Sequence, residues 1–371
     1  MPRNLHAGHI SRYPRPVLSD ALATTVRRHA DGPRPSFTAA DVLVLSAGNP
    51  VAEVVHGVEA AFSDAHGTPL PETTAVTAET RFDLASITKL FTAALLLEEL
   101  ADHGLNLRTP VADVLPAYRE DGRQSVRFGH LLTHTSGLPA VWPGWRDRPN
   151  PEQARQEVLD IRPTAAPDAA HVYSCVGYLH AGFAAEALAG QPLDALLRRR
   201  LTGPLGLTST GYRPPPGTPV AATEWQEYPV PGITHGEVHD ETARSLGGIA
   251  GNAGIFATAR DLARFGEALR VGAPGVLRES TRALMSRPLV EGPSYRQAVG
   301  PRLADTANFG RLATGGLGHT GFTGTMLLVA PRLGLTLVVL TNAVHPNRQW
   351  NDPSVFRRDV AAVVAENGGA A

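Results

Sequence analysis

The chain has 371 residues, of which 43% are hydrophobic and 19% charged, and this composition is typical of a globular protein with a sizeable core. A formal net charge of −1 argues against nucleic acid or an acidic membrane surface as a partner. No run approaches the roughly 18 apolar residues of a membrane helix, and the first 20 residues contain no apolar signal-peptide centre. With a single cysteine, Cys175, these features predict a cytoplasmic protein without an intramolecular disulfide.

Strands are predicted near the two ends of the chain and helices in its middle. Short runs rich in valine and leucine, separated by turn residues, predict two hairpins. A segment of leucines and alanines that is apolar nearly all round predicts a buried helix. In chain order the predicted segments are a proline-bearing arm (1–20), a short helix (21–30), the first hairpin (41–46 and 51–57), the buried helix (about 86–103), a further helix (261–269), the second hairpin (325–330 and 335–341) and a final helix (about 353–366).

This order predicts an α/β (α+β) fold in which one antiparallel sheet joins both hairpins. Helices from the two ends of the chain would flank the sheet, and a mainly helical subdomain would be inserted between the hairpins. After the arm, residues 21–371 would form one domain. Its sandwich would comprise about 21–80 and 246–371, and its helical part about 81–245. We expect the functional site where the two parts meet.

The first chemical candidate is the segment Ser86-Ile87-Thr88-Lys89 at the start of the buried helix. Positions i and i+3 share a helix face, which suits a serine nucleophile paired with a lysine. Lys89 is the only lysine, since the other 33 of the 34 basic residues are arginines. Arginine keeps its proton at working pH, whereas a buried lysine can lose it. The competing interpretation is a helix-capping serine followed by a solvated lysine, and the apolar flanks of the motif disfavour it.

Two further segments contain residues that could serve the same nucleophilic catalysis. Tyr173-Ser174-Cys175 follows a proline-rich loop and precedes a predicted helix. Gly318-His319-Thr320-Gly321-Phe322 precedes the strand of the second hairpin. With Ser86 and Lys89, these segments have the order and approximate spacing of the serine β-lactamase and penicillin-binding-protein superfamily. The chain most closely resembles the class C β-lactamase-like serine hydrolases, which include esterases, D-aminopeptidases and transacylases, over roughly residues 35–365. The segments His134–Leu138 and Gly247–Gly254 are also similar to that family.

The resemblance implies a role for each matching residue. Ser86 would be acylated, and Lys89 would accept its proton or keep a neighbouring base deprotonated. Tyr173 would carry protons between the nucleophile and the leaving group. The backbone N–H groups of Ser86 and Phe322 would form the oxyanion hole, and His319-Thr320-Gly321 would bind substrate on the edge strand.

Two residues depart from the usual pattern of that family. Cys175 occupies a position that is usually asparagine, and His319 one that is usually lysine. A thiol orients substrate less well than an amide, and histidine is not a permanent cation. Both changes argue against a drug-inactivating β-lactamase or a cell-wall transpeptidase. Cys175 as the nucleophile is a separate and weaker hypothesis.

Other segments favour structural roles. Residues 235–241 contain two histidines and three acidic residues, but their spacing is not that of a His-Glu-x-x-His metal helix, so we expect a loop at the pocket rim. The glycines from Gly247 lack the following lysine of a phosphate loop, and His134 fits a structural hydrogen bond. We expect no metal and no cofactor. Four aromatic residues could line an acceptor pocket or simply pack, namely Trp142, Trp145, Trp225 and Tyr228.

The predicted function is that of a serine hydrolase that cleaves an ester or amide of a small metabolite through an acyl-enzyme on Ser86. The alternative is a transacylase that passes the acyl group to an amine or alcohol, for example in secondary metabolism. A third hypothesis is a non-catalytic binding protein on the same fold, which the presence of both Ser86 and Lys89 disfavours. The expected partners are a small-molecule acyl donor and, for a transacylase, the acceptor.

Overall fold

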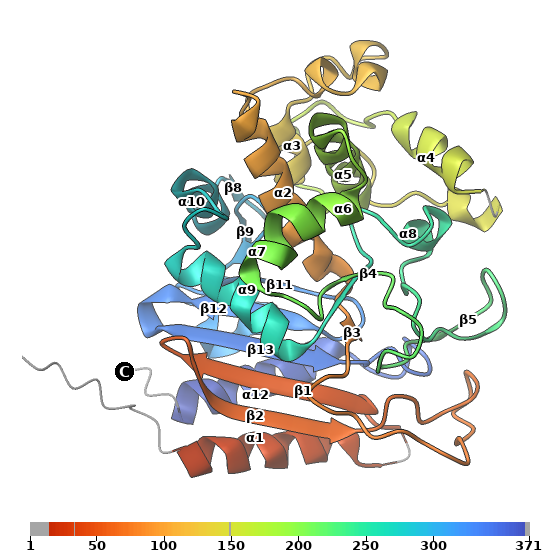
Figure 1. Cartoon of the computed structure of the whole chain (residues 1–371), viewed down its shortest axis with the longest axis vertical. Helices are drawn as coiled ribbons and strands as arrows, with labels where there is room; N and C mark the ends of the chain where they lie inside the picture. The colour runs from red at the N-terminus through yellow and green to blue at the C-terminus, as the bar shows by residue number, and fades with distance from the viewer. Residues whose placement is uncertain (1–14, 33, 148–149, 368–371) are drawn as a thin grey trace, which may run out of the picture.

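An eight-stranded antiparallel sheet forms the framework of the chain in the computed structural model, which describes residues 15–32, 34–147 and 150–367 (Figure 1). The strand order is β2-β1-β13-β12-β11-β10-β9-β8. The strands are β1 (Ala39–Ser46), β2 (Asn49–Gly57), β8 (Val290–Glu291), β9 (Arg296–Gln297), β10 (Arg302–Leu303), β11 (Leu317–Thr320), β12 (Met326–Ala330) and β13 (Leu335–Thr341).

Both predicted hairpins are confirmed, and so is their union in one sheet. Strand β1 pairs with β2 on one side and with β13 on the other, where Ala40 lies opposite Thr341 and Val44 opposite Leu337. Strand β13 pairs in turn with β12. The first and last strands in the sequence are therefore neighbours, second and third from one edge of the sheet.

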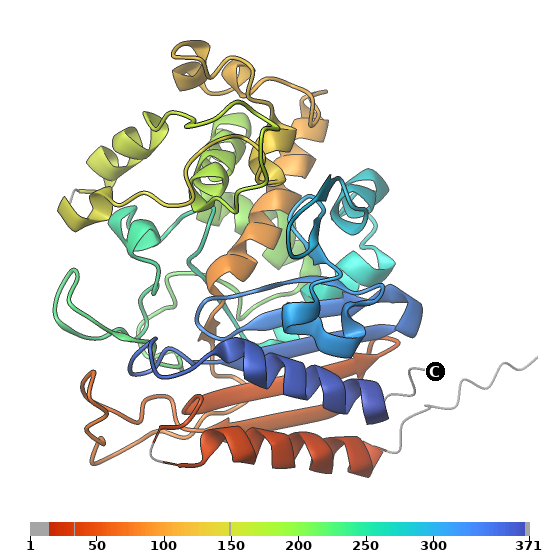
Figure 2. The ribbon, with the colours of Figure 1, turned by 180° about the vertical axis from the view of Figure 1, so that it is seen from behind.

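Helices cover both faces of the sheet. Helices α1 (Arg15–Ala30) and α12 (Pro353–Asn367) lie side by side on one face (Figure 2). Helix α9 (Ala259–Val271) packs on the other face, against β12 and β13. Successive residues of a strand point to opposite faces. Accordingly, Val42 joins the core under α1 and α12, and Leu43 joins the core under α9. The strands are thus apolar on both faces because both faces are buried.

The predicted arm over residues 1–20 is wrong for its last six residues. Helix α1 begins at Arg15, and Leu18 and Leu22 are buried against the sheet. Proline is tolerated in the first turn of a helix, so Pro16 does not interrupt α1. Residues 1–14 lie outside the described residues.

The middle of the chain is mainly helical, as predicted. Its helices are α2 (Thr88–Asp102), α3 (Phe128–Leu132), α4 (Pro151–Leu159), α5 (Cys175–Ala189), α6 (Leu193–Leu197), α7 (Gly203–Leu205) and α8 (Glu241–Ser245). Helix α2 is buried along its length from Thr88 to Leu100, which confirms the prediction of a buried helix, and it packs against α5. Two short helices, α10 (Glu279–Ser286) and α11 (Thr306–Phe309), follow the middle region.

Two small sheets in this region were not predicted. The first contains β3 (Phe82–Asp83), β7 (Ile255–Ala257) and β4 (Gly211–Tyr212), and the second pairs β5 (Trp225–Gln226) with β6 (Gly232–Ile233). Strands of two or three residues are too short to show a periodic pattern in sequence. Within the described ranges, no helix is long and apolar enough to cross a membrane.

Candidate active site

Ser86 and Lys89 are in direct contact. Ser86 lies in a single 3₁₀ turn (Ala85–Ile87) that leads into α2, and Lys89 lies in the first turn of α2. The Lys89 Nζ donates to Ser86 Oγ at 2.9 Å and to the backbone carbonyl of Asn252 at 3.0 Å. Lys89 is 0% exposed, whereas Ser86 is half-buried. The only lysine of the chain is therefore held against the hydroxyl from inside the protein.

The turn that presents Ser86 is held by Asp83. Ala85 has φ 46°, an unfavourable conformation for a residue with a Cβ. One Asp83 oxygen accepts from the Ala85 N–H at 2.8 Å, and the other accepts from the His239 N–H at 2.7 Å. Burial raises the pKa of Asp83, and these two hydrogen bonds oppose the rise. The carboxyl group therefore stabilises a strained turn immediately before the serine.

Tyr173 approaches Lys89 from the loop before α5. Its ring centroid lies 5.1 Å from Lys89 Nζ, and its buried hydroxyl has no hydrogen-bond partner among the described residues. Cys175, a free thiol and the first residue of α5, also lies close enough to influence the lysine. Burial lowers the pKa of Lys89, but Cys175 and Tyr173 raise it, and its net pKa is above the ordinary value. The position of the lysine therefore favours its ammonium form.

His319 lies beneath the site and does not line the cavity. It is buried in β11, where its Nδ1 donates to the Thr320 carbonyl at 2.7 Å. Burial, together with the charges of Arg302 and Lys89, lowers the pKa of His319 well below its ordinary value. A neutral imidazole at neutral pH cannot replace the cation that a lysine would supply at this position.

The turn between β11 and β12 packs directly on the segment that carries the serine. Thr323 Oγ1 donates to the Asp83 carbonyl at 2.7 Å, and Thr325 Oγ1 donates to the Leu84 carbonyl at 3.2 Å. Gly321 fits this contact because it has no side chain. A Cβ built on Gly321 would lie 2.0 Å from Thr325 Oγ1 and 2.4 Å from the Leu84 carbonyl oxygen.

Replacing Gly321 by alanine is expected to lower the free energy of unfolding by about 1–3 kcal/mol, because the added methyl group overpacks this contact. It should also slow any reaction at Ser86, because it pushes β11 away from the turn. Urea unfolding measures the first effect and the rate of probe labelling the second. Gly211→Ala is the matched control, since a Cβ at Gly211 meets no atom within 4 Å. Equal stability of the two variants would contradict the prediction.

A cavity of about 470 Å³ opens over the serine. Among the predicted site residues, Ser86, Tyr173, Thr320, Gly321 and Phe322 line it, and Lys89, Cys175 and His319 do not. The other lining residues are Arg302, Ala343, Val344, Arg348, Asn351, Asp352, Pro353 and Arg357.

Three arginines of this cavity were missed by sequence reasoning. Arg302 lies over the Tyr173 ring, 5.1 Å from the centroid, and its Nη1 is 3.5 Å from Thr320 Oγ1. Arg357 is buried and donates to the Gly321 carbonyl, and burial together with Arg302 lowers its pKa to about 9. Arg348 also lines this cavity. No signal in a sequence with 33 arginines distinguishes these three.

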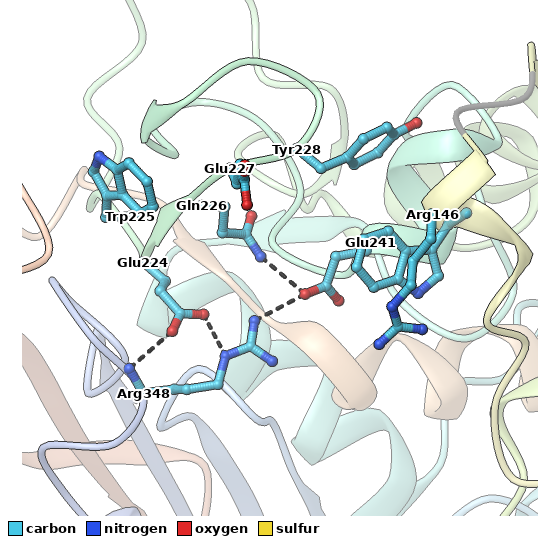
Figure 3. A pocket seen from close by; sticks show the side chains of 9 residues that line it. Arg146, Glu224, Trp225, Gln226, Glu227, Tyr228, Glu241 and Arg348 are labelled. Atoms are coloured by element: carbon cyan, nitrogen blue, oxygen red, sulfur yellow. Dashed lines mark hydrogen bonds and ion pairs between the residues drawn. The ribbon is translucent and has the colours of Figure 1, made fainter.

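A second cavity of about 410 Å³ shares the lining residue Arg348 with the first. Figure 3 shows the residues that line this second cavity. Trp145, Trp225 and Tyr228 line the second cavity, whereas Trp142 is buried in the core. Its polar walls come from Arg146, Glu224, Gln226, Glu227 and Glu241.

The other histidines and the glycine passage considered in the sequence form hydrogen bonds with the surrounding backbone. His134 Nδ1 accepts from the Ser174 N–H at 3.0 Å, in line with a structural role. His235 Nε2 donates to the Val220 carbonyl at 2.7 Å. Within the described part of the chain, no group of three or more histidine, cysteine or acidic residues could hold a metal ion. The glycine passage contributes to the site through Asn252, whose backbone carbonyl accepts from Lys89.

Comparisons with known proteins agree with this fold. The family described as Beta-lactamase matches residues 32–362. A protein of Escherichia coli strain K12, which carries the provisional name D-alanyl-D-alanine carboxypeptidase, is 30% identical over 314 residues, or 72% of this chain and 70% of that protein.

Solved structures with a similar fold include those of three enzymes. A class C beta lactamase has a TM-score of 0.73 at 18% identity, covering 96% of this chain and 99% of that chain. EstCE1, a hydrolase with promiscuous acyltransferase activity, has a TM-score of 0.72 at 21% identity, covering 94% and 99%. A mutant of the simvastatin synthase LovD from Aspergillus terreus has a TM-score of 0.71 at 19% identity, covering 98% and 100%. At these identities the similarity concerns the fold alone.

Proposed function

The chain belongs to the Beta-lactamase family, as its three motifs predicted, and on this premise we propose that it is a serine hydrolase that forms an acyl-enzyme on Ser86. The observation that carries the proposal is the 2.9 Å contact between Lys89 Nζ and the Oγ of Ser86, which lines a cavity together with Tyr173. A buried lysine beside an accessible serine hydroxyl suits nucleophilic catalysis.

In the proposed reaction Ser86 Oγ attacks the carbonyl carbon of an ester or amide. The serine proton passes to the oxygen of Tyr173, which enters this step as the phenolate, and the C–O or C–N bond breaks as that proton passes on to the leaving group. The acyl group then remains on Ser86 until a second nucleophile attacks it, and the same proton path operates in reverse. The backbone N–H groups of Ser86 and Phe322 would stabilise the oxyanion, and a single donor of this kind contributes about 3 kcal/mol.

Lys89 would act as a fixed cation in this scheme. The sequence left open whether it accepts the serine proton or supports a neighbouring base. The raised pKa of Lys89 supports the second role. Its ammonium group and the Arg302 guanidinium lie on the Tyr173 ring, where they provide positive charge beside the oxygen that receives the proton.

The arginines of the cavity support a substrate with an anionic group near the reacting carbonyl. Arg302 lies beside Thr320, where it could bind a carboxylate in place of the cation that His319 does not provide. A peptide that ends in D-alanine, the substrate class in the name of the Escherichia coli relative, carries such a carboxylate. Small esters and amides with a free carboxylate are therefore the first substrates to test.

Acyl transfer is the second candidate function. The second cavity adjoins the first at Arg348 and could hold an amine or alcohol acceptor. The printed description of EstCE1 joins hydrolysis and acyl transfer in one enzyme of this fold. Hydrolysis remains the primary proposal, because water needs no dedicated binding site.

A fluorophosphonate probe tests the proposal directly. Intact-mass measurement and peptide mapping should find one label, on Ser86, and Ser86→Ala should remove it. Cys175→Ala should keep the label, which separates the serine from the thiol hypothesis. An unlabelled protein under conditions that label a known serine hydrolase would favour a binding protein. Incubation with an activated ester and an amine then distinguishes free acid, the product of hydrolysis, from the amide of a transacylase.

A further inference from the structure

The loop that carries His239 connects the two halves of the proposed oxyanion hole. The first half is the turn at Ser86, and the backbone of His239 is bound to it through Asp83. The His239 N–H donates to Asp83 Oδ2 at 2.7 Å, and Asp83 Oδ1 accepts from Ala85 at 2.8 Å. One carboxylate thus links His239 to the residue immediately before Ser86.

The second half is Phe322, and the ring of His239 contacts it. The two rings stack with centroids 5.6 Å apart and planes at 25°. Arg348 also contacts this ring, with its guanidinium carbon 5.2 Å from the centroid. Phe322 is 54% exposed, so the hydrophobic core does not fix its position. The contacts with His239 and Arg348 are therefore the ones that hold the ring at the cavity wall.

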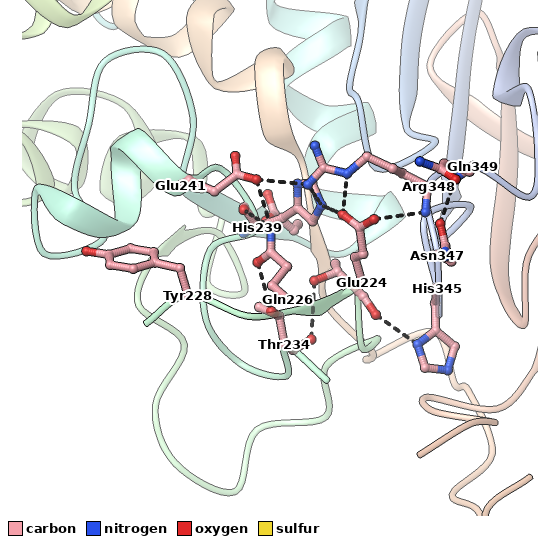
Figure 4. Close-up of polar contacts among 12 residues, drawn as sticks. Glu224, Gln226, Tyr228, Thr234, His239, Glu241, His345, Asn347, Arg348 and Gln349 are labelled. Carbon is pink, nitrogen blue, oxygen red and sulfur yellow. Dashed lines mark hydrogen bonds and ion pairs between the residues drawn. The ribbon is translucent and has the colours of Figure 1, made fainter. Parts of the chain in front are cut away.

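A buried carboxylate fixes the orientation of the His239 ring. His239 Nε2 and Glu224 Oε2 are 2.9 Å apart, and the same oxygen accepts from Arg348 Nε (Figure 4). The second Glu224 oxygen accepts from the Arg348 N–H at 3.0 Å. Burial raises the pKa of Glu224, but His239 and Arg348 lower it, and the net pKa is below the ordinary value. Arg348 is held in turn by Glu241 at 2.9 Å.

We propose that His239 is a positioning residue that sets the spacing between the two oxyanion donors, and that Glu224 orients its ring. The backbone of His239 acts on the Ser86 donor through Asp83, and its side chain acts on the Phe322 donor by stacking. This inference rests on the proposed function, because the oxyanion hole forms only if Ser86 attacks a carbonyl group. His239 itself does not contact the reacting atoms. It concerns neither the nucleophile nor the proton path.

Steady-state hydrolysis of an activated ester by a set of variants tests this role. His239→Ala keeps the backbone N–H and removes the ring, so kcat should fall about 10- to 100-fold, part of what a complete loss of one donor costs. The KM should change less than about threefold, because the donors act mainly on the transition state. His239→Phe retains the stacking but loses the contact with Glu224, so its kcat should recover to a value between those of His239→Ala and wild type. Glu224→Gln, which loosens the ring, should give an intermediate kcat.

The affinity for an arylboronic acid provides a readout that a merely structural role would not change. A boronate bound to Ser86 Oγ places an oxygen where the oxyanion forms, so its dissociation constant should rise in parallel with the loss of kcat. His235→Ala is the matched control, since its ring lies in the same loop and contacts the Val220 carbonyl rather than Phe322. We expect wild-type kcat and boronate affinity for this control.

Three results would overturn the proposal. These are a wild-type kcat in His239→Ala, an equal loss in His235→Ala, or a His239→Phe variant as impaired as His239→Ala. If His239→Ala does not fold, His239→Phe and Glu224→Gln still decide the question through the boronate affinities. Labelling with the fluorophosphonate probe distinguishes the proposed acyl-enzyme function from the proposed role of His239. A wild-type protein unlabelled at Ser86 overturns both, whereas a labelled wild type with variants of undiminished kcat overturns only the role of His239.

Discussion

Replacing Lys89 by methionine is expected to reduce the rate of Ser86 acylation by three or more orders of magnitude while the protein remains folded. Methionine has nearly the length of lysine and no charge, and the site is 0% exposed, so the variant is spared the cost of burying an ammonium group. The variant loses the donor to Ser86 Oγ and the cation beside Tyr173. Stopped-flow measurement of acylation by an activated ester, with thermal unfolding of the same samples, checks both parts.

Thr92→Val is the control for this prediction. Thr92 lies one turn further along α2, and its hydroxyl donates to the Gly251 carbonyl at 2.8 Å, next to the carbonyl that Lys89 contacts. Loss of the Thr92 hydroxyl perturbs the same contact between α2 and residues 251–252 but leaves the hydrogen bond from Lys89 to Ser86 in place. The rate of acylation should therefore stay within about threefold of wild type. Comparable losses in the two variants would show that Lys89 acts through the fold and not through its charge.

Replacing Asp41 by asparagine is expected to stabilise the protein by about 4 kcal/mol at pH 7. Asp41 lies in β1 with both carboxyl oxygens buried and unpartnered within the described residues. Burial, with a contribution from Glu53, raises the pKa of Asp41 from 3.8 to about 8. The folded state then holds a proton that the unfolded state releases above pH 3.8, so wild-type stability falls as the pH rises from about 4 to about 8.

The asparagine variant lacks this proton, so its stability advantage should grow by about 1.4 kcal/mol for each pH unit between pH 5 and pH 7.5. Urea unfolding at several pH values measures the slope. Asp113→Asn, at an exposed aspartate of the helical region, should change stability by less than about 0.5 kcal/mol at each pH. An advantage of Asp41→Asn that does not vary with pH would contradict the expected protonation of Asp41 in the folded protein.

The sequence predicted those parts of the fold that long periodic segments determine. The hairpins at β1–β2 and β12–β13 and the apolar helix α2 all have strong local patterns. The contact between Ser86 and Lys89 was predictable because i, i+3 spacing on a helix brings side chains together. The start of α1 was missed because proline was taken as the mark of an arm, whereas the burial of Leu18 and Leu22 extends the helix to Arg15.

The remainder of the site depends on contacts between distant segments, which no local pattern encodes. Arg302 and Arg348 reach the cavity from a two-residue strand and from a loop after β13, and nothing near them in sequence distinguishes them from other arginines. His319 matched a motif position, but its burial and neutral state depend on the neighbouring strand and on Arg302. The contacts of His239 likewise join residues that lie far apart in sequence, namely Asp83, Glu224 and Phe322.

The pairing of β1 with β13 has a consequence for the order of folding during synthesis. Ala40 lies opposite Thr341, about 300 residues later in the chain, and at 5–20 residues per second the ribosome needs roughly 15–60 s to make that interval. Until then the β1–β2 hairpin has one unpaired edge where β13 will bind, and the turn at Ser86 lacks the segment between β11 and β12 that packs on it. The helical region can assemble from local contacts in the meantime, because closing long loops is the slow step. We therefore expect truncated nascent chains to acquire helix α2 before they acquire reactivity at Ser86.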